Sequence, residues 1–219
     1  MLVETLTLGP YQTNCYLLHD QKSVWVIDPA FAGETILHHI KAKKLHVEAV
    51  ILTHSHWDHL MGLPELVAAF PEMSIYIHPQ EAHFLGKEGG RRLRQLAISI
   101  DPSQARVPQS FWESLPEPTH TLKDGEILPG CDLQVLHTPG HTAGSVSLYR
   151  AADNLLFSGD TLFAGSIGRT DLPTSNPSAI VPAIKSKLLT LPEQTTVYPG
   201  HGPATTIGKE MTNPWLVNY

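Results

Sequence analysis

The chain has 219 residues, of which 42% are hydrophobic and 16% are charged, so it can bury a sizeable core and is not expected to be disordered. Its length fits one large domain, residues 1–219, better than two small ones. The formal net charge of −6, with no basic run longer than RRLR at 91–94, argues against a nucleic-acid or anionic-membrane partner.

Neither export nor membrane insertion is expected. The N-terminal stretch MLVETLTLGP has an early Glu4 and lacks the apolar core that a signal peptide needs. No apolar run approaches the ~18 residues that span a bilayer. The two cysteines, Cys15 and Cys131, are too few for a disulfide framework, so a reducing, cytoplasmic location is expected.

The pattern of apolar residues predicts short strands that alternate with helices. The first half is expected to form three strands, a helix, a strand, a helix and a strand, at 2–8, 15–20, 24–28, 33–44, 47–53, 60–70 and 74–78. The second half is expected to form three strands, a helix and a strand, at 132–138, 145–150, 154–160, 178–190 and 195–200. Residues 86–120 are rich in Gly, Pro and Arg with weak periodicity, and we interpret them as a cover over one face. Mixed strands with helices outside them predict an α/β sandwich.

Four side chains that can bind metal follow directly after the apolar run AVIL, in the string THSHWDH. They are His54, His56, Asp58 and His59. Buried without partners they would be costly, because polar groups in a low-dielectric interior need hydrogen bonds or a metal ion. His54 and His56 can turn toward one ion, whereas Asp58 and His59 lie past the bend and would reach a second.

Three further strands each end in an imidazole or a carboxylate beside glycine. His141 lies in PGHTAGS, Asp160 in SGD and His201 in PGHG. Loops at strand ends are where an α/β scaffold builds its sites. With the first four residues this makes five His and two Asp, which are too many for one tetrahedral zinc with about four ligands. They suit two metal ions that share a bridging carboxylate, ~3.5–4 Å apart.

These motifs, in this order, resemble those of the metallo-β-lactamase fold hydrolases over essentially the whole chain, and most of all the short form of hydroxyacylglutathione hydrolase (type II glyoxalase). The resemblance implies an αββα sandwich of two mixed sheets flanked by helices, with the site at one edge. It also implies a first metal held by His54, His56 and His141, a second held by Asp58, His59 and His201, and a bridge from Asp160. Asp28 matches a family aspartate that steadies the metal loops, although a turn-forming Asp before Pro29 explains it equally well.

The implied function is hydrolysis of a thioester such as S-lactoylglutathione, a small-molecule substrate. Two cations lower the pKa of a shared water until hydroxide is present near neutral pH, and Asp58 would orient it. The chain has no G-x-S-x-G string, so a covalent serine mechanism is not expected. Zinc suffices for hydrolysis, and a His/Asp set also accepts iron or manganese. The sequence does not indicate an oligomeric state.

The segment GRTD bears on the choice of substrate. Arg169 matches a basic residue with which type II glyoxalases bind the glycine carboxylate of glutathione, but Asp171 stands where they have a tyrosine. Long-form enzymes also add a helical domain with further glutathione contacts, beyond the point at which this sequence ends. A local salt bridge between Arg169 and Asp171 explains the pair equally well.

Other activities fit the same motifs. A persulfide dioxygenase resembles the chain in them and in GRTD, and uses one iron that His54, His141 and Asp160 would hold here. A lactonase or β-lactamase would use the same metal chemistry, although a secreted β-lactamase would need an export signal. An RNA-processing nuclease would need a basic surface, which the net charge of −6 does not favour.

Overall fold

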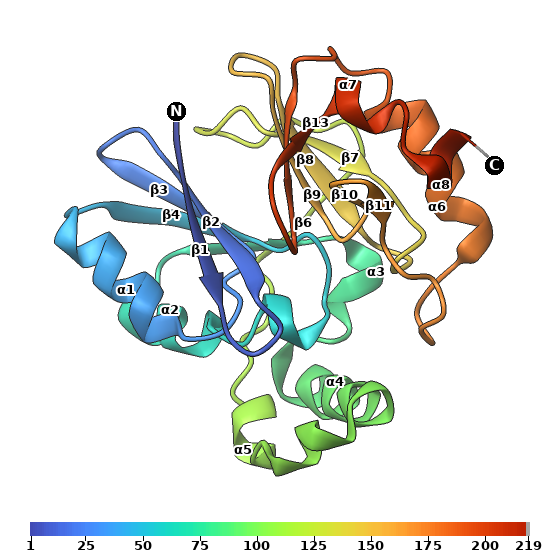
Figure 1. Cartoon of the computed structure of the whole chain (residues 1–219). Coiled ribbons are helices and arrows are strands. Elements are labelled where there is room, and N and C mark those ends of the chain that lie inside the picture. The colour runs from blue at the N-terminus through green and yellow to red at the C-terminus, as the bar shows by residue number, and fades with distance from the viewer. Residues whose placement is uncertain (218–219) are drawn as a thin grey trace. The chain divides into compact units, whose positions relative to one another are not determined.

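A computed structural model gives the fold and describes residues 1–217. Contacts between residues divide the chain into two compact units, Met1–Thr121 and Leu122–Tyr219, drawn in blue to green and in yellow to red (Figure 1). Each unit has its own sheet. The expectation that 1–219 is a single domain stays a prediction.

A six-stranded mixed sheet forms the first unit. Its strands follow one another in chain order: β1 (Leu2–Leu8), β2 (Thr13–His19), β3 (Ser23–Ile27), β4 (His46–Ile51), β5 (Ser74–Ile77) and β6 (His120–Thr121). The first three strands are antiparallel, and β3 to β6 are parallel. The loops after β3, β4 and β5 therefore leave the same edge of the sheet, where a site can be built.

Two helices, α1 (Gly33–Ala42) and α2 (Leu63–Ala69), lie side by side against this sheet (Figure 1). Ile36, Leu37 and Ile40 of α1 have the spacing of one helix face and are buried in the core. The predicted helix at 60–70 begins later than expected, because a short 3₁₀ turn, η1 (Trp57–His59), takes up the metal motif first. Trp57 is buried in the core beside it, so it packs inside the unit.

The segment 86–120 is more regular than its sequence suggested. It forms α4 (Gly86–Ile100), the 3₁₀ turn η2 (Pro102–Arg106) and α5 (Gln109–Trp112), after a short helix α3 (Pro79–Ala82). Glycines at 86, 89 and 90 weaken the helical signal because glycine lowers helix propensity. Tertiary packing overrides that weakness: Leu93 and Trp112 are fully buried in the core of the first unit.

A five-stranded sheet forms the second unit, in the order β13-β12-β9-β8-β7. The strands are β7 (Gln134–His137), β8 (Val146–Arg150), β9 (Leu155–Gly159), β12 (Thr196–Pro199) and β13 (Thr205–Thr206). Only β9 and β12 pair in parallel, so both leave the sheet at the same edge. A small hairpin of β10 (Leu162–Phe163) and β11 (Ser166–Ile167) follows β9.

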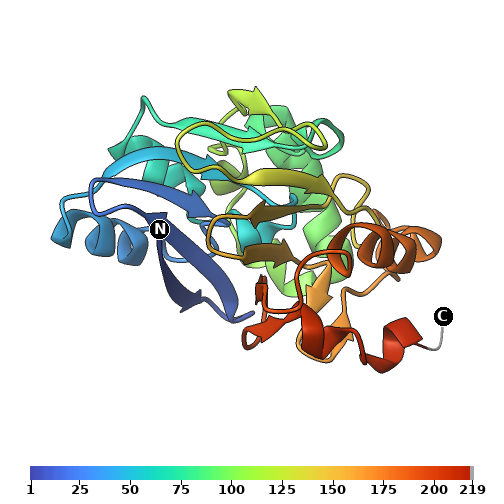
Figure 2. The ribbon, with the colours of Figure 1, turned by 90° about the horizontal axis from the view of Figure 1, so that it is seen from above.

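The helices of the second unit come from its C-terminal part. They are α6 (Pro177–Ala183), which continues as a π-helical turn η3 (Ile184–Leu188), α7 (Ile207–Glu210) and α8 (Pro214–Val217), drawn in orange and red (Figure 2). Ile180, Ile184 and Leu188 pack in one core cluster with Leu156 of β9 and Val197 of β12. The predicted helix at 178–190 is therefore present as α6 and η3.

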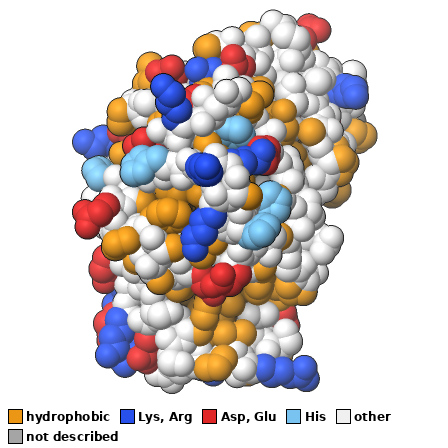
Figure 3. All heavy atoms as spheres, turned by 90° about the vertical axis from the view of Figure 1, so that its left-hand side faces the viewer, with side chains coloured by type: hydrophobic (Ala, Val, Ile, Leu, Met, Phe, Trp, Pro, Cys, Tyr) orange, Lys and Arg blue, Asp and Glu red, His pale blue; other side chains and the backbone are white. Residues whose placement is uncertain are grey.

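Both units have mixed sheets with helices beside them, which confirms the predicted α/β class. Each predicted strand is present with bounds shifted by at most two residues, whereas the two-residue strands β6, β10, β11 and β13 were not predicted. Within residues 1–217 no helix is long and apolar enough to cross a bilayer. On the face drawn in Figure 3, basic side chains are interspersed with acidic ones.

The packing of α4 predicts an unusual outcome for Gly90→Ala. Alanine normally stabilises a helix interior relative to glycine by about 1 kcal/mol. At position 90, however, a Cβ would overlap the backbone carbonyl of Trp112, which cannot move as a side chain can. We therefore expect Gly90→Ala to lower the free energy of unfolding in urea by about 1–3 kcal/mol, the usual range for overpacking. Gln95→Ala, an exposed position of the same helix, is the control and should change it by less than about 0.5 kcal/mol. A stabilised Gly90→Ala variant would contradict this packing.

Candidate metal centre

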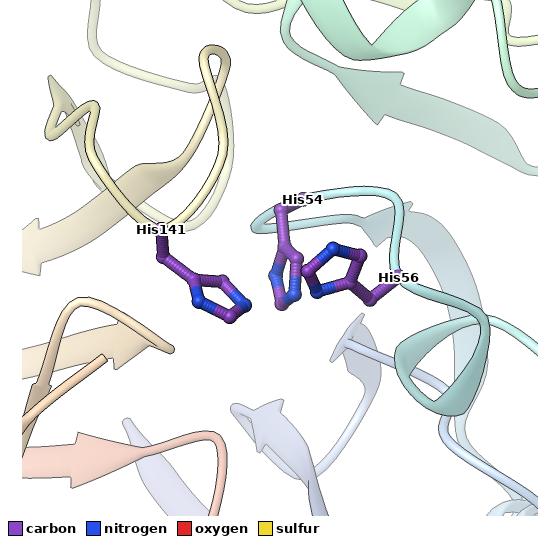
Figure 4. Close-up of side chains that lie close together, drawn as sticks. All are labelled: His54, His56 and His141. Carbon is purple, nitrogen blue, oxygen red and sulfur yellow. The ribbon is translucent and has the colours of Figure 1, made fainter. Parts of the chain in front are cut away.

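Four predicted ligands of the first unit lie on the loop between β4 and α2. His54, His56, Asp58 and His59 are all buried, although each is polar. The ring centroid of His54 lies 4.8 Å from that of His56 and 4.2 Å from that of His59. Figure 4 shows His54 and His56 on this loop, with His141 on the loop that follows β7. The unit therefore gathers the four side chains that the motif predicted.

The Asp28 carboxylate, at the end of β3, organises this loop. It accepts hydrogen bonds from the Thr53 backbone N–H (2.8 Å) and the Thr53 hydroxyl (2.6 Å). It also lies 2.8 Å from His59 Nδ1, and a carboxylate can only accept, so Nδ1 carries the proton. Asp28 has a left-handed backbone (φ 49°) before Pro29, so it makes the turn and holds the loop as well.

The same chain of hydrogen bonds determines the tautomer of His54. The Thr53 hydroxyl donates to Asp28, so its oxygen accepts the bond from His54 Nδ1 at 3.1 Å. Both His54 and His59 therefore present Nε2 with its lone pair, which is the form that binds a metal ion. Ligand atoms of Asp28, His54 and His59 lie within 4.8 Å of one another, but the bonds of Asp28 make it the support of this group and not a ligand.

Two further partners of the loop were not predicted from the sequence. The hydroxyl of Thr13, the first residue of β2, donates to Asp58 Oδ2 at a distance of 2.9 Å. Glu81, a buried carboxylate of α3, accepts from the backbone N–H and the hydroxyl of Ser55. Neither residue belongs to a metal motif, and both lie 26 or more positions away from the residue they contact. No local pattern could have identified them.

In the second unit, three predicted ligands follow three different strands. His141 lies after β7, Asp160 after β9 and His201 after β12. Asp160 Oδ2 lies 3.5 Å from His141 Nε2 and 3.5 Å from His201 Nε2. The parallel pairing of β9 and β12 brings Asp160 and His201 to one edge of the sheet. One carboxylate oxygen thus faces two imidazole nitrogens.

Hydrogen bonds from the segment after β11 orient His141. Its Nδ1 donates to the Arg169 carbonyl at 2.9 Å, and the Ser175 hydroxyl donates to its backbone carbonyl at 2.7 Å. Nε2 is thereby left to face Asp160. Gly168 makes this arrangement possible, because a Cβ there would overlap the Asp160 carbonyl oxygen.

These distances fit metal ions better than direct hydrogen bonds. Two ligand atoms ~2.1 Å from a tetrahedral ion lie about 3.4 Å apart. Asp160 Oδ2 is 3.5 Å from each of its two imidazole nitrogens, and Asp58 Oδ2 is 3.6 Å from His59 Nε2. Good N–H···O bonds are shorter, 2.7–3.2 Å. The donor set of imidazole nitrogens and carboxylate oxygens suits zinc, iron or manganese.

The cysteines are not part of this centre. Burial, and secondarily the Asp28 carboxylate, raises the pKa of the Cys15 thiol well above its usual range. Burial raises the pKa of Cys131 to about 11. Both are free thiols and stay protonated at neutral pH, so neither is a thiolate ligand or nucleophile.

Arg169 and Asp171 form an exposed ion pair with two parallel hydrogen bonds. Arg169 Nε and Nη2 each donate to one oxygen of Asp171 at 2.7 Å. The hydrogen bond from Arg169 lowers the pKa of Asp171 to about 2. The local salt bridge, one of the two interpretations of this pair from the sequence, is therefore present, and binding of a substrate carboxylate by Arg169 stays a prediction.

The comparisons with known proteins agree with this fold and donor set. A family model described as the metallo-beta-lactamase superfamily matches residues 8–201. A probable metallo-hydrolase of Bacillus subtilis, YqgX, is 37% identical over 98% of this chain and 97% of its own length. Hydroxyacylglutathione hydrolase GloC of Haemophilus influenzae is 31% identical over 99% of this chain and 98% of its own length.

Two solved structures are also similar to the whole chain. BLEG-1, named as a B3 metallo-beta-lactamase, has a TM-score of 0.84 with 35% identity and covers 99% of this chain and 100% of its own. TTHA1623, in a di-iron-bound form, has a TM-score of 0.82 with 36% identity and covers 98% of this chain and 100% of its own.

The role of Asp28 as an acceptor predicts the effect of Asp28→Asn. Asparagine places an NH₂ group against at least one of three donors, so we expect the free energy of unfolding to fall by about 1–3 kcal/mol. Loss of the support should also weaken divalent-metal affinity about 10–100-fold, as for other supports of metal ligands. A chromogenic chelator in competition with the protein would measure this affinity.

The matched control is Asp20→Asn. Asp20 is an exposed carboxylate of the same unit that accepts backbone N–H groups of Lys22 and Ser23, away from the metal loop. Asp20→Asn should leave metal affinity unchanged. Equal affinities for the two variants would show that Asp28 does not support the ligands.

Proposed function

Because the chain belongs to the metallo-β-lactamase superfamily, we propose that it is a dinuclear metal-dependent hydrolase of thioesters, with S-lactoylglutathione as a first representative. The observation that carries the proposal is the position of one Asp160 oxygen at 3.5 Å from two imidazole nitrogens. A carboxylate that faces two ligands in this way suits a bridge between two ions.

We assign the ligands on the family pattern. His54, His56 and His141 would hold the first ion, Asp58, His59 and His201 would hold the second, and Asp160 would be shared between them. When bound, the two ions supply hydroxide near neutral pH and stabilise the charge of the tetrahedral oxyanion. The di-iron-bound form of TTHA1623 supports the number of ions, and the His/Asp donor set leaves zinc, iron and manganese open.

The protein's own groups prepare this chemistry before any substrate binds. Asp28 and the Arg169 carbonyl accept hydrogen bonds from the Nδ1–H groups of His59 and His141, so the Nε2 atoms of these two residues keep the lone pair. Thr13 donates to Asp58 Oδ2 and fixes the direction of this carboxylate, which would orient the attacking water.

A thioester suits this site because a thiol is a good leaving group and needs no strong general acid. The name of the Haemophilus influenzae relative, hydroxyacylglutathione hydrolase, supports this class of substrate. Cys15 and Cys131 are both buried and protonated, so attack by water is favoured over a covalent thiol intermediate. The two free thiols also support our proposal of a cytoplasmic location.

Two other reactions compete with thioester hydrolysis. A persulfide dioxygenase would need one iron, held by His54, His141 and Asp160, and would consume oxygen. Hydrolysis of β-lactams is suggested by the name of BLEG-1, whose chain is 35% identical. Metal count, thiol release, oxygen uptake and β-lactam cleavage separate the three.

We predict two divalent metal ions per chain in protein prepared from metal-supplemented medium, as measured by elemental analysis. Asp160→Ala should remove both ions, because it removes the bridge, and His201→Ala should mainly remove one. Asp153→Ala is the control, since Asp153 is a carboxylate of the same unit that pairs with Arg150. A reproducible content of one ion in the unaltered protein would contradict the dinuclear centre.

We also predict release of free thiol from acyl thioesters, lost on treatment with a chelator and restored by added metal. Asp58→Asn should lower kcat by about 100-fold or more, because a neutral amide orients water poorly and binds metal weakly. Assays of oxygen uptake with glutathione persulfide and of β-lactam cleavage would run in parallel. Iron-dependent oxygen uptake without thiol release would replace the proposal by the dioxygenase.

A further inference from the structure

We propose that a hollow beside His141 binds the thiol part of the substrate and prefers an uncharged thiol to an anionic one such as glutathione. This inference rests on the proposed thioester hydrolysis. The hollow has a volume of about 570 Å³ and is lined by residues 167–171 with Pro177 and Trp215, all in the second unit. We call it the Arg169 hollow.

The wall of the Arg169 hollow is also the support of the metal ligands. Gly168 packs against the Asp160 carbonyl, and a Cβ on it would lie 3.2 Å from the Cβ of His141. The next residue, Arg169, accepts the hydrogen bond of His141 Nδ1. The residues that line the hollow therefore contact the bridging residue Asp160 and the ligand His141 directly, and we place the part of the substrate that does not react beside them.

Charge compensation within the Arg169 hollow argues for an uncharged ligand. Arg169 directs two of its N–H groups to Asp171, and the pair has no net charge. An incoming carboxylate meets the negative charge of Asp171 together with the guanidinium. To bind Arg169 with the same geometry, the carboxylate of a ligand must displace Asp171. Asp171 lies only two residues from Arg169 in the chain, so its local concentration is always high.

The remaining walls of the Arg169 hollow offer apolar surface. Ile167 and Pro177 line it, and Trp215 is 61% exposed although it is one of the largest side chains. The backbone beneath Trp215 is firmly held, because its N–H donates to Asn213 Oδ1 at 3.0 Å and the next residue, Leu216, is buried. An exposed indole on a fixed support suits contact with an apolar or amide-containing chain.

Trp215 provides a readout that does not depend on hydrolysis. Trp25, Trp57 and Trp112, the other tryptophans, are buried, so quenching of exposed indole fluorescence reports on Trp215. We would titrate S-hexyl-N-acetylcysteamine, an uncharged thioether, and S-hexylglutathione, an anionic one, into the metal-loaded protein. We expect the uncharged thioether to bind about fivefold more tightly, the scale of an exposed charge interaction. Trp215→Phe should abolish the signal.

Asp171→Asn tests the origin of the preference. It frees Arg169, so binding of S-hexylglutathione should strengthen about threefold to fivefold while binding of the uncharged thioether stays unchanged. The control is Asp124→Asn, which changes the net charge equally and breaks another exposed ion pair of the same unit, to Lys187. The control should not alter the preference.

The results separate this inference from the proposed function. Equal binding of the two thioethers, or an unchanged preference in Asp171→Asn, overturns the uncharged-thiol hollow even if thioesters are hydrolysed. The expected binding without hydrolysis of any thioester keeps the hollow and overturns the thioesterase. If the thioesterase and the hollow are both upheld, kcat/KM for S-lactoyl-N-acetylcysteamine should exceed that for S-lactoylglutathione. Asp171→Asn should bring the two kcat/KM values closer together.

Discussion

The first unit's metal loop depends on one buried carboxylate. Asp28 accepts two hydrogen bonds from Thr53 and one from His59, and through the Thr53 hydroxyl it also determines the protonation of His54. A buried carboxylate without partners is costly, and so is an imidazole with its proton on the wrong nitrogen. The four bonds satisfy both needs at once. As a result, the loop after β4 holds the Nε2 atoms of His54 and His59 in fixed positions with their lone pairs available to a metal ion.

In the second unit, the candidate ligand His141 is oriented by a backbone carbonyl in place of a carboxylate. The Nδ1–H group of His141 donates a hydrogen bond to the backbone carbonyl of Arg169, whereas that of His59 donates to a carboxylate. A carboxylate raises the basicity of the imidazole more than a neutral carbonyl does. The orientation of the His141 ring therefore depends on the backbone of residues 168–171, whereas that of His59 depends on a side chain.

The sequence predicted the parts of the fold that have a local cause. Strands were located by their apolar runs, and the seven candidate ligands were chosen from motifs at strand ends, because those patterns lie within a few neighbouring residues. The helix α4 was not predicted, because Gly89 and Gly90 weaken its signal while close packing against Phe84 and Trp112 requires them. Thr13 and Glu81 were not identified either. Their roles arise from contacts across 45 and 26 residues of chain, which only the folded structure reveals.

In the segment after β11, the backbone supports the candidate metal ligands, whereas two exposed side chains are available to contact a substrate. Gly168 has no room for a side chain against the Asp160 carbonyl, and the carbonyl of Arg169 is used by His141. The side chains of Arg169 and Asp171, by contrast, are more than half exposed and contact each other instead of the ligands. A substitution at 171 can therefore change the charge seen by a substrate while the backbone that supports His141 stays in place. Under the proposed function, substrate specificity can therefore vary at that position while the support of the candidate ligand His141 is kept.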